Sequence, residues 1–205
     1  MPARIGLFGG SFNPIHFGHL ITARSVAEQL GHARIMLIPA SVPPHKQHAA
    51  LAAPEHRLEM ARRAVAGDPL FEVSDMELRR AGPSYTFDTV TALRARFGDA
   101  ATFDWIIGAD TLPELITWHR ISELVRIVQF VTMVRPGQPP RDLETLRACV
   151  GDAAFDGLLA HRLTTPAVEI SATDLRGRVA RGDSIRYCCP DSVIDYIQAQ
   201  KLYWT

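Results

Sequence analysis

The chain has 205 residues, 47% of them hydrophobic, which is enough to bury the core of one domain or of one domain with a small carboxyl-terminal extension. Its 22 basic residues balance its 22 acidic ones, so composition argues against a general nucleic-acid binder and against a protein held at a membrane surface. Charges interrupt every long apolar stretch and the first residues lack the apolar core of a signal peptide, so we expect a cytoplasmic protein.

Apolar, β-branched runs alternate along the chain with patterns typical of helices. The runs that predict strands lie at residues 4–8, 35–39, 71–74, 103–108, 129–134 and 167–170. The helical patterns lie at residues 18–30, 55–66, 86–97, 121–125, 142–150, 173–180 and 191–200. This alternation predicts an α/β fold, a Rossmann-like doubly wound parallel sheet in one domain over residues 1–205, with a small helical part at about 171–205. Ligands of such sheets bind beyond the carboxyl ends of the strands.

A glycine-rich turn follows the first predicted strand. Gly9 and Gly10 lack a Cβ atom, so the backbone can turn sharply there and a phosphate can approach it closely. If a helix begins near residue 17 or 18, His16 and His19 can direct their imidazoles toward one spot near its positive end. The pattern predicts a site for a phosphate that gains charge in a transition state. The alternative is a tight turn that carries a zinc pair or two surface histidines.

Three segments after later strands carry weaker signals. The loop that contains His45 and Lys46 is stiffened by prolines and, taken alone, is typical of a solvated loop. Ser84 or Thr86 can cap the helix predicted at 86–97, whose free N–H groups suit a carboxylate, although plain capping is the favoured explanation of these residues when they are taken alone. Asp110 and Trp118 suit a ribose and a flat heteroaromatic ring, or else a helix cap and a core position.

A further segment, residues 170–176, contains the start of the helix predicted at 173–180. Ser171 and Thr173 can cap that helix, and Arg176 lies in its first turn, where the positive helix end disfavours a cation. A bound phosphate would resolve this conflict. The three cysteines, two of them adjacent, are a poor disulfide framework and lack the spacing of a zinc knuckle, so we expect reduced thiols.

Taken together, these segments resemble the motifs of bacterial nicotinate-nucleotide adenylyltransferases, in the same order. The glycine-rich turn is similar to the G-x-F-x-P-x-H-x-G-H form of the (H/T)-x-G-H motif of the nucleotidyltransferase superfamily. The later segments resemble the family's P-P-H-K, S-Y-T-x-D-T, I-G-x-D and I-S-S-T-x-I-R elements. In the last of these, Ala172 replaces the second serine and removes a hydroxyl group, and Leu175 replaces the isoleucine.

The resemblance implies transfer of AMP from ATP to nicotinate mononucleotide, which gives deamido-NAD and pyrophosphate, with Mg²⁺ arriving on ATP and no metal site in the protein itself. The implied catalytic residues are His16, His19, Lys46 and Arg176. The implied ATP-binding residues are Gly9, Gly10, Ser11, Phe12, Gly18, Ser171 and Thr173. The implied residues for the acceptor are His45, Ser84, Tyr85, Thr86, Gly108, Asp110 and Trp118.

The sequence leaves several alternatives open. The acceptor could instead be nicotinamide mononucleotide or phosphopantetheine, because an amide oxygen can accept the same N–H bonds as a carboxylate. A non-catalytic nucleotide-binding module would carry the same glycine-rich turn, and a nucleic-acid-binding protein could use the same fold, although no basic aromatic stripe supports that option. The oligomeric state, monomer or homo-oligomer, is also left open.

Overall fold

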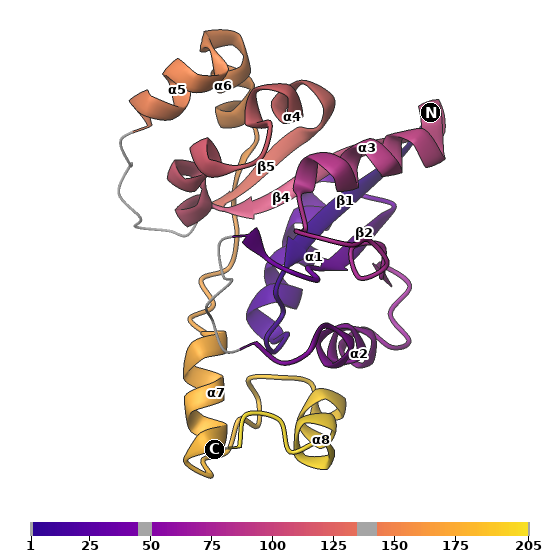
Figure 1. Ribbon diagram of the computed structural model, residues 1–205, viewed down its shortest axis with the longest axis vertical. Coiled ribbons are helices and arrows are strands. Elements are labelled where there is room, and N and C mark those ends of the chain that lie inside the picture. The colour runs from indigo at the N-terminus through magenta and orange to yellow at the C-terminus, as the bar shows by residue number, and fades with distance from the viewer. Residues whose placement is uncertain (1, 45–50, 135–142, 205) are drawn as a thin grey trace.

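A parallel sheet of six strands, in the order β3-β2-β1-β4-β5-β6, forms the centre of the computed structural model (Figure 1). The structure describes residues 2–44, 51–134 and 143–204. The strands are β1 (Ala3–Gly10), β2 (Arg34–Pro39), β3 (Phe71–Val73), β4 (Ala101–Gly108), β5 (Gln129–Val134) and β6 (Arg162–Thr164). The helices are α1 (Phe17–Leu30), α2 (Pro54–Ala64), α3 (Thr86–Phe97), α4 (Ile121–Ile127), α5 (Glu144–Val150), α6 (Asp152–Ala160), α7 (Ala172–Ala180) and α8 (Asp191–Ala199), with 3-10 segments η2 (Gly98–Ala100) and η3 (Ala109–Thr117).

Helices cover both faces of the sheet, because its central strands are apolar on both sides. In β2, Ile35 and Leu37 belong to a core cluster shared with α1, α2, α7 and α8. Met36 and Ile38, which alternate with them, belong to a second cluster shared with α3, α4, α5 and α6. This arrangement explains why the central strands have nearly continuous hydrophobic sequences. It confirms the predicted α/β fold with a parallel sheet.

The strand order reverses at β1, which pairs with β2 on one side and with β4 on the other. The turn after β1 and the segment η3 after β4 therefore leave the sheet side by side, at its carboxyl edge. Such a reversal opens a crevice between neighbouring connections, and ligands of α/β sheets bind there. The glycine-rich turn predicted to bind phosphate thus lies at the reversal point.

The last strand differs from the sequence prediction. Residues 167–170 form no strand, and the sixth strand is β6, whose residues pair with Thr132–Val134 at the edge of the sheet. Pro166 follows this short strand and lacks the N–H group that would continue the ladder, so the chain leaves the edge there. Helix α6 was not predicted, and it begins directly after Gly151, whose φ of 84° ends α5. Residue 142, the predicted start of the preceding helix, lies outside the described residues.

The carboxyl-terminal helices α7 and α8 lie at one end of the molecule, near α2 (Figure 1). Oγ of Ser192 in α8 donates a hydrogen bond to the carbonyl oxygen of Arg63 in α2 at 3.0 Å. The hydroxyl group of Tyr196 in α8 and Nδ1 of His56 in α2 are hydrogen-bonded at 2.8 Å. Among the described residues, no helix is both long and apolar enough to cross a membrane.

Candidate active site

The turn between β1 and α1 brings two histidines together. Helix α1 begins at Phe17 with His16 as its N-cap, and the backbone N–H of His16 donates a hydrogen bond to Nδ1 of His19 at 3.3 Å. The two imidazole rings stack, with their centroids 3.7 Å apart. A Cβ atom on Gly18 would lie 3.0 Å from the His16 ring, so a larger residue at this position would push the ring aside. The two histidines therefore converge, as the sequence predicts.

The surroundings of each histidine determine its protonation. Because Nδ1 of His19 accepts the bond from the backbone, the neutral ring carries its proton on Nε2, which makes Nε2 a donor. His16 is 5% exposed, and this burial lowers its pKa to about 4. Near neutral pH, His16 is therefore an uncharged ring that can donate one hydrogen bond. A phosphate beside it would raise its pKa again, because an anion stabilises the protonated ring.

Two cavities adjoin at this edge of the sheet. The larger, which we call the histidine cavity, has a volume of about 620 Å³ and is lined by His16, His19 and Arg176 among other residues. The smaller, which we call the tryptophan cavity, has a volume of about 400 Å³ and is lined by Trp118 and Tyr85 among others. Both are lined by Phe8, Gly9, Gly10, Ser11, Gly108, Asp110 and Thr111. This shared wall places ligands of the two cavities next to each other.

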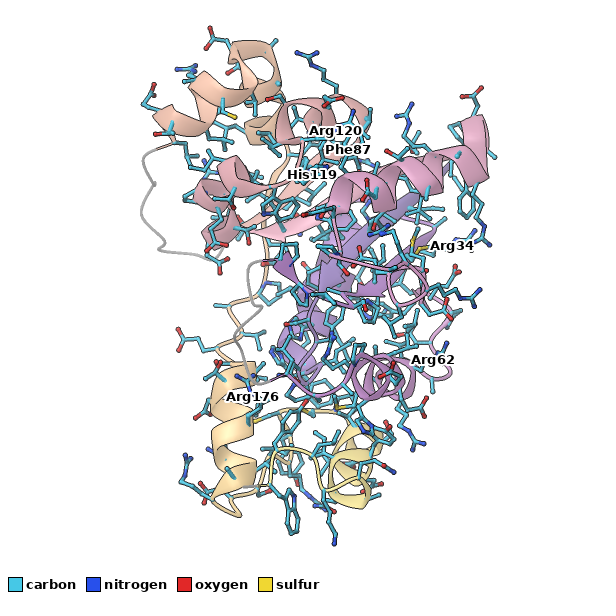
Figure 2. All side chains as sticks on the ribbon, in the orientation of Figure 1. Arg34, Arg62, Phe87, His119, Arg120 and Arg176 are labelled. Carbon is cyan, nitrogen blue, oxygen red and sulfur yellow. The ribbon has the colours of Figure 1, made fainter. Side chains whose placement is uncertain are left out.

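Helix α7 supplies a cation to the histidine cavity. Ser171 is the N-cap of this helix, and its Oγ accepts a hydrogen bond from the backbone N–H of Asp174 at 3.5 Å, so the capping prediction is confirmed for Ser171, whereas Thr173 lies inside the helix. Nη1 of Arg176, which is labelled in Figure 2, donates to the carbonyl oxygen of Asn13 at 2.8 Å, and its Nη2 donates to Oγ1 of Thr173 at 3.3 Å. These two bonds hold the guanidinium at the cavity wall beside the turn that carries the histidines.

Two tryptophans form part of the tryptophan cavity. Trp118 is half-buried and meets the ring of the buried Trp105 edge-on, with the ring centroids 6.5 Å apart. A Cβ atom on Gly9 would lie 2.6 Å from the Trp105 ring, so the turn can cross this ring only with glycine at that position. Trp118 is thus a core residue on one side and a cavity wall on the other.

Two aromatic contacts join the segment after Trp118 to the beginning of α3 (Figure 2). The ring of His119 stacks on Tyr85, with the centroids 4.3 Å apart. The guanidinium of Arg120 lies 3.8 Å from the centroid of the Phe87 ring. These contacts hold Trp118 and the first turn of α3 at the same cavity, although they come from separate connections of the sheet.

Ser84 has a different local role from the predicted helix cap. The N-cap of α3 is Tyr85, and no side chain caps this helix, so the prediction of a Ser84 or Thr86 cap is wrong. The buried Oγ of Ser84 instead accepts hydrogen bonds from the backbone N–H groups of Ser41 at 2.9 Å and Val42 at 3.3 Å. Ser84 therefore fastens the loop after β2 to the beginning of α3, where Thr86 lines the tryptophan cavity.

Glu77, which the sequence analysis missed, lies beneath the tryptophan cavity. It is 4% exposed, lines the cavity, and accepts a hydrogen bond from Oγ1 of Thr89 at 2.6 Å. Burial raises the pKa of this carboxyl group. No short sequence motif points to Glu77, because its hydrogen-bond partner Thr89 lies in α3, twelve positions further along the chain.

Arg57, also missed, is a buried cation that joins the loops around the site. It is 1% exposed, and burial lowers its pKa. Its guanidinium donates to the carbonyl oxygens of Ser11 at 3.0 Å, Ala40 at 2.5 Å, Ser41 at 2.9 Å and Ala52 at 2.9 Å. The local sequence signal for its burial is its position in α2, where Arg57 shares the buried face of the helix with Leu58.

His45 and Lys46 lie outside the described residues. Pro43 and Pro44, which precede them, line the tryptophan cavity. The other sixteen predicted site residues lie within the described ranges, and each of them lines one or both cavities. Within the described ranges, no group of three or more histidine, cysteine, aspartate or glutamate side chains could hold a metal ion.

Known proteins share this sequence and fold. A family model described as cytidylyltransferase-like matches residues 7–178. A protein of Opitutus terrae named probable nicotinate-nucleotide adenylyltransferase is 43% identical, over 98% of this chain and 97% of its own. A protein of Thermomicrobium roseum with the same name is 40% identical, over 99% of this chain and 92% of its own.

The fold comparison agrees with the sequence comparison. A solved structure described as Plasmodium falciparum nicotinic acid mononucleotide adenylyltransferase complexed with NaAD has a TM-score of 0.77 and 18% sequence identity, over 98% of this chain and 97% of that chain. At this identity the similarity supports the fold alone. The fold therefore persists in a protein whose sequence has diverged far from this one.

Proposed function

We propose that this chain, which belongs to the nicotinate-nucleotide adenylyltransferases of the cytidylyltransferase-like family, transfers AMP from ATP to nicotinate mononucleotide and releases pyrophosphate. One observation carries the proposal. A cavity with two histidines and an arginine shares a wall with a cavity that has an aromatic lining, at the point where the strand order reverses. The first suits the phosphates of ATP, and the second suits the pyridine ring of the acceptor.

The reaction is an in-line displacement at the α-phosphorus of ATP. A phosphate oxygen of nicotinate mononucleotide forms a bond to the α-phosphorus, and the bond from that phosphorus to the oxygen bridging to the β-phosphate breaks. Pyrophosphate leaves with the electron pair. The nucleophile is already an anion at neutral pH, so the protein need not supply a base. Catalysis then depends on placing the two phosphates and on stabilising the charge that develops.

The two histidines are proposed to act on the α-phosphate. Nε2 of His19 is a donor because Nδ1 accepts the backbone bond, and the ring is fixed by its stack on His16. A donor whose direction is set before the substrate binds loses little energy to reorganisation during the reaction. His16 enters the reaction uncharged, and its pKa rises as negative charge accumulates beside it.

Arg176 is proposed to bind the leaving pyrophosphate. Its hydrogen bonds to Asn13 and Thr173 leave further guanidinium N–H groups for phosphate oxygens, since an arginine has five donors. The N-terminus of α7 adds a positive dipole end to the same wall. Lys46, outside the described residues, is proposed to contact the same phosphates, and His45 to face them from that loop.

The tryptophan cavity is proposed to bind the nicotinate moiety. Trp118 offers a ring face for stacking on the pyridine. The free N–H groups in the first turn of α3, near Thr86, suit its carboxylate. Asp110, which lines both cavities, can accept hydrogen bonds from ribose hydroxyl groups.

Mg²⁺ is proposed to arrive bound to ATP, where it would neutralise part of the charge on the leaving pyrophosphate. Asp110 is the one carboxylate among the described residues that line the histidine cavity. A site with so few protein ligands fits a hard cation that keeps several waters and is held chiefly by phosphate oxygens.

The test is pyrophosphate release by the purified protein with Mg-ATP and each of three acceptors at equal concentration. We expect release with nicotinate mononucleotide and much less with nicotinamide mononucleotide or phosphopantetheine. Activity with another acceptor would retain the adenylyl transfer and refute the carboxylate site at α3. Absence of release with all three would refute the proposed reaction and favour a nucleotide-binding module.

A further inference from the structure

Tyr203, near the carboxyl terminus, reaches the turn that carries the histidines. Its hydroxyl group donates a hydrogen bond to Oδ1 of Asn13 at 2.8 Å, across 190 positions of sequence. Burial raises the pKa of this hydroxyl group, so it stays protonated and remains a donor over the whole physiological pH range. Tyr203 does not line either cavity. Its hydrogen bond to Asn13, which does line the histidine cavity, is therefore the direct connection from Tyr203 to the site.

Asn13 connects three parts of the chain around the histidine cavity. It is 2% exposed, and its Oδ1 also accepts a hydrogen bond from the backbone N–H of Ala52 at 3.0 Å. Its backbone carbonyl oxygen accepts the bond from Nη1 of Arg176 at 2.8 Å. The orientation of Asn13 thus affects both the end of the loop after β2 and the cation proposed to bind pyrophosphate.

We propose that Tyr203 is a positioning residue for the adenylyl transfer, because its hydroxyl group fixes Asn13 and, through Asn13, the guanidinium of Arg176. The inference rests on the proposed function and extends it to the carboxyl-terminal part of the chain. Without the hydroxyl group, one acceptor position of Asn13 Oδ1 loses its partner inside the protein, and the turn gains freedom to shift. Small displacements of groups that bind a transition state reduce rate strongly.

Tyr196 offers a matched control. It lies in α8, seven positions before Tyr203, and its hydroxyl group also makes a hydrogen bond with a distant residue, Nδ1 of His56 at 2.8 Å. Its bond joins α8 to α2, and Tyr196 lines neither cavity. Tyr196→Phe and Tyr203→Phe therefore each delete one hydroxyl group from the same part of the molecule, and only the second touches the turn.

The experiment compares kcat, the two KM values and the Tm of the full chain with those of both variants. We expect Tyr203→Phe to lower kcat by about fivefold, the effect of one hydrogen bond between uncharged groups, and to leave KM for nicotinate mononucleotide unchanged. Tyr196→Phe should have the kcat of the unmodified chain, and the two variants should have similar Tm values. Equal kcat values for the unmodified chain and Tyr203→Phe, or equal losses in both variants, would overturn the inference.

A double-mutant cycle tests the path through Arg176. In the Arg176→Ala background, Tyr203→Phe should lower kcat by less than about twofold, because the group that it positions is gone. A full, independent loss in that background would overturn the proposed path. These outcomes differ from a failure of the proposed function, in which the unmodified chain itself releases no pyrophosphate from ATP and nicotinate mononucleotide.

Discussion

The histidine cavity and the tryptophan cavity share the turn after β1, yet different kinds of side chain form the rest of their walls. The first has two imidazoles and a guanidinium, all held by hydrogen bonds or stacking to the turn itself. The second has rings that pack on one another and on the core, with Trp118 against Trp105 and Tyr85 against His119. Polar groups of fixed direction suit a charge that develops during the reaction, whereas ring faces suit the part of a ligand that does not react, such as a pyridine ring.

The difference between the two cavities predicts that one affects the rate of the reaction and the other affects substrate binding. A group that interacts more strongly with the transition state than with the substrate affects kcat, whereas a group that binds both equally affects KM. Substitutions in the histidine cavity should therefore lower kcat, and substitutions in the tryptophan cavity should raise KM for one substrate. Variants in each cavity test this division, and the largest effect is expected at His19.

His19→Ala should lower kcat by about 10²–10³-fold, the usual effect of removing one preorganised donor. Two amide variants show which ring atom matters. His19→Asn keeps a polar atom near the place of Nδ1, where the backbone N–H of His16 binds, and loses Nε2. His19→Gln keeps a donor near the place of Nε2. Steady-state pyrophosphate release should show that His19→Gln retains more activity than His19→Asn; the reverse order would assign the effect to the structure of the turn.

Trp118→Ala should raise KM for nicotinate mononucleotide by about 5- to 100-fold, as expected when an aromatic stacking partner is lost, with a smaller change in kcat. The control is Trp204→Ala, because Trp204 is 61% exposed and lines neither cavity. Initial rates measured over a range of each substrate separate the two KM values. An increase confined to KM for ATP would contradict the division between the cavities.

The sequence predicts the central strands and the edge strand β3 well, and the edge strand β6 poorly, for a physical reason. Strands β1, β2, β4 and β5 are buried on both faces, so their apolar runs predict them to within two residues at each end. The edge strand β6 has three residues and two of them are exposed, so no apolar run marks it. The apolar residues Val168 and Ile170 instead line the histidine cavity, which is why residues 167–170 resemble a strand.

The predicted site residues come from local motifs, and the missed ones come from long-range contacts. His16 and His19 can be inferred because three positions along a helix place them together. Arg57 binds Ser11 across 46 positions, and Tyr203 binds Asn13 across 190. The spacing of residues within a motif cannot predict such pairs, because it is the folding of the chain around the sheet that brings them together. The residues proposed to act on the substrates are therefore easier to predict from the sequence than those that hold them in place.

The smallest expected effect is the contribution of His16, in the histidine cavity, to the pH dependence of stability. Burial lowers the pKa of His16 to about 4, below the ordinary value of 6.5. Between these two pH values the unfolded chain binds more protons than the folded protein, so stability is lost as pH falls through this range. The slope from one such group is at most about 1.4 kcal/mol per pH unit.

His16→Gln should remove this contribution while keeping a polar side chain of similar reach. Calorimetric scans of the ligand-free protein from pH 7 toward pH 4.5, in buffers without phosphate, should show Tm falling less steeply for the variant than for the unmodified chain. Saturating ATP, without an acceptor, should flatten the curve of the unmodified chain and leave that of His16→Gln nearly unchanged, because the α-phosphate proposed to lie beside His16 raises its pKa toward the ordinary value. Parallel curves for the two proteins, with or without ATP, would show that His16 is not the group that titrates. They would also remove the argument that its pKa responds to a phosphate in the histidine cavity.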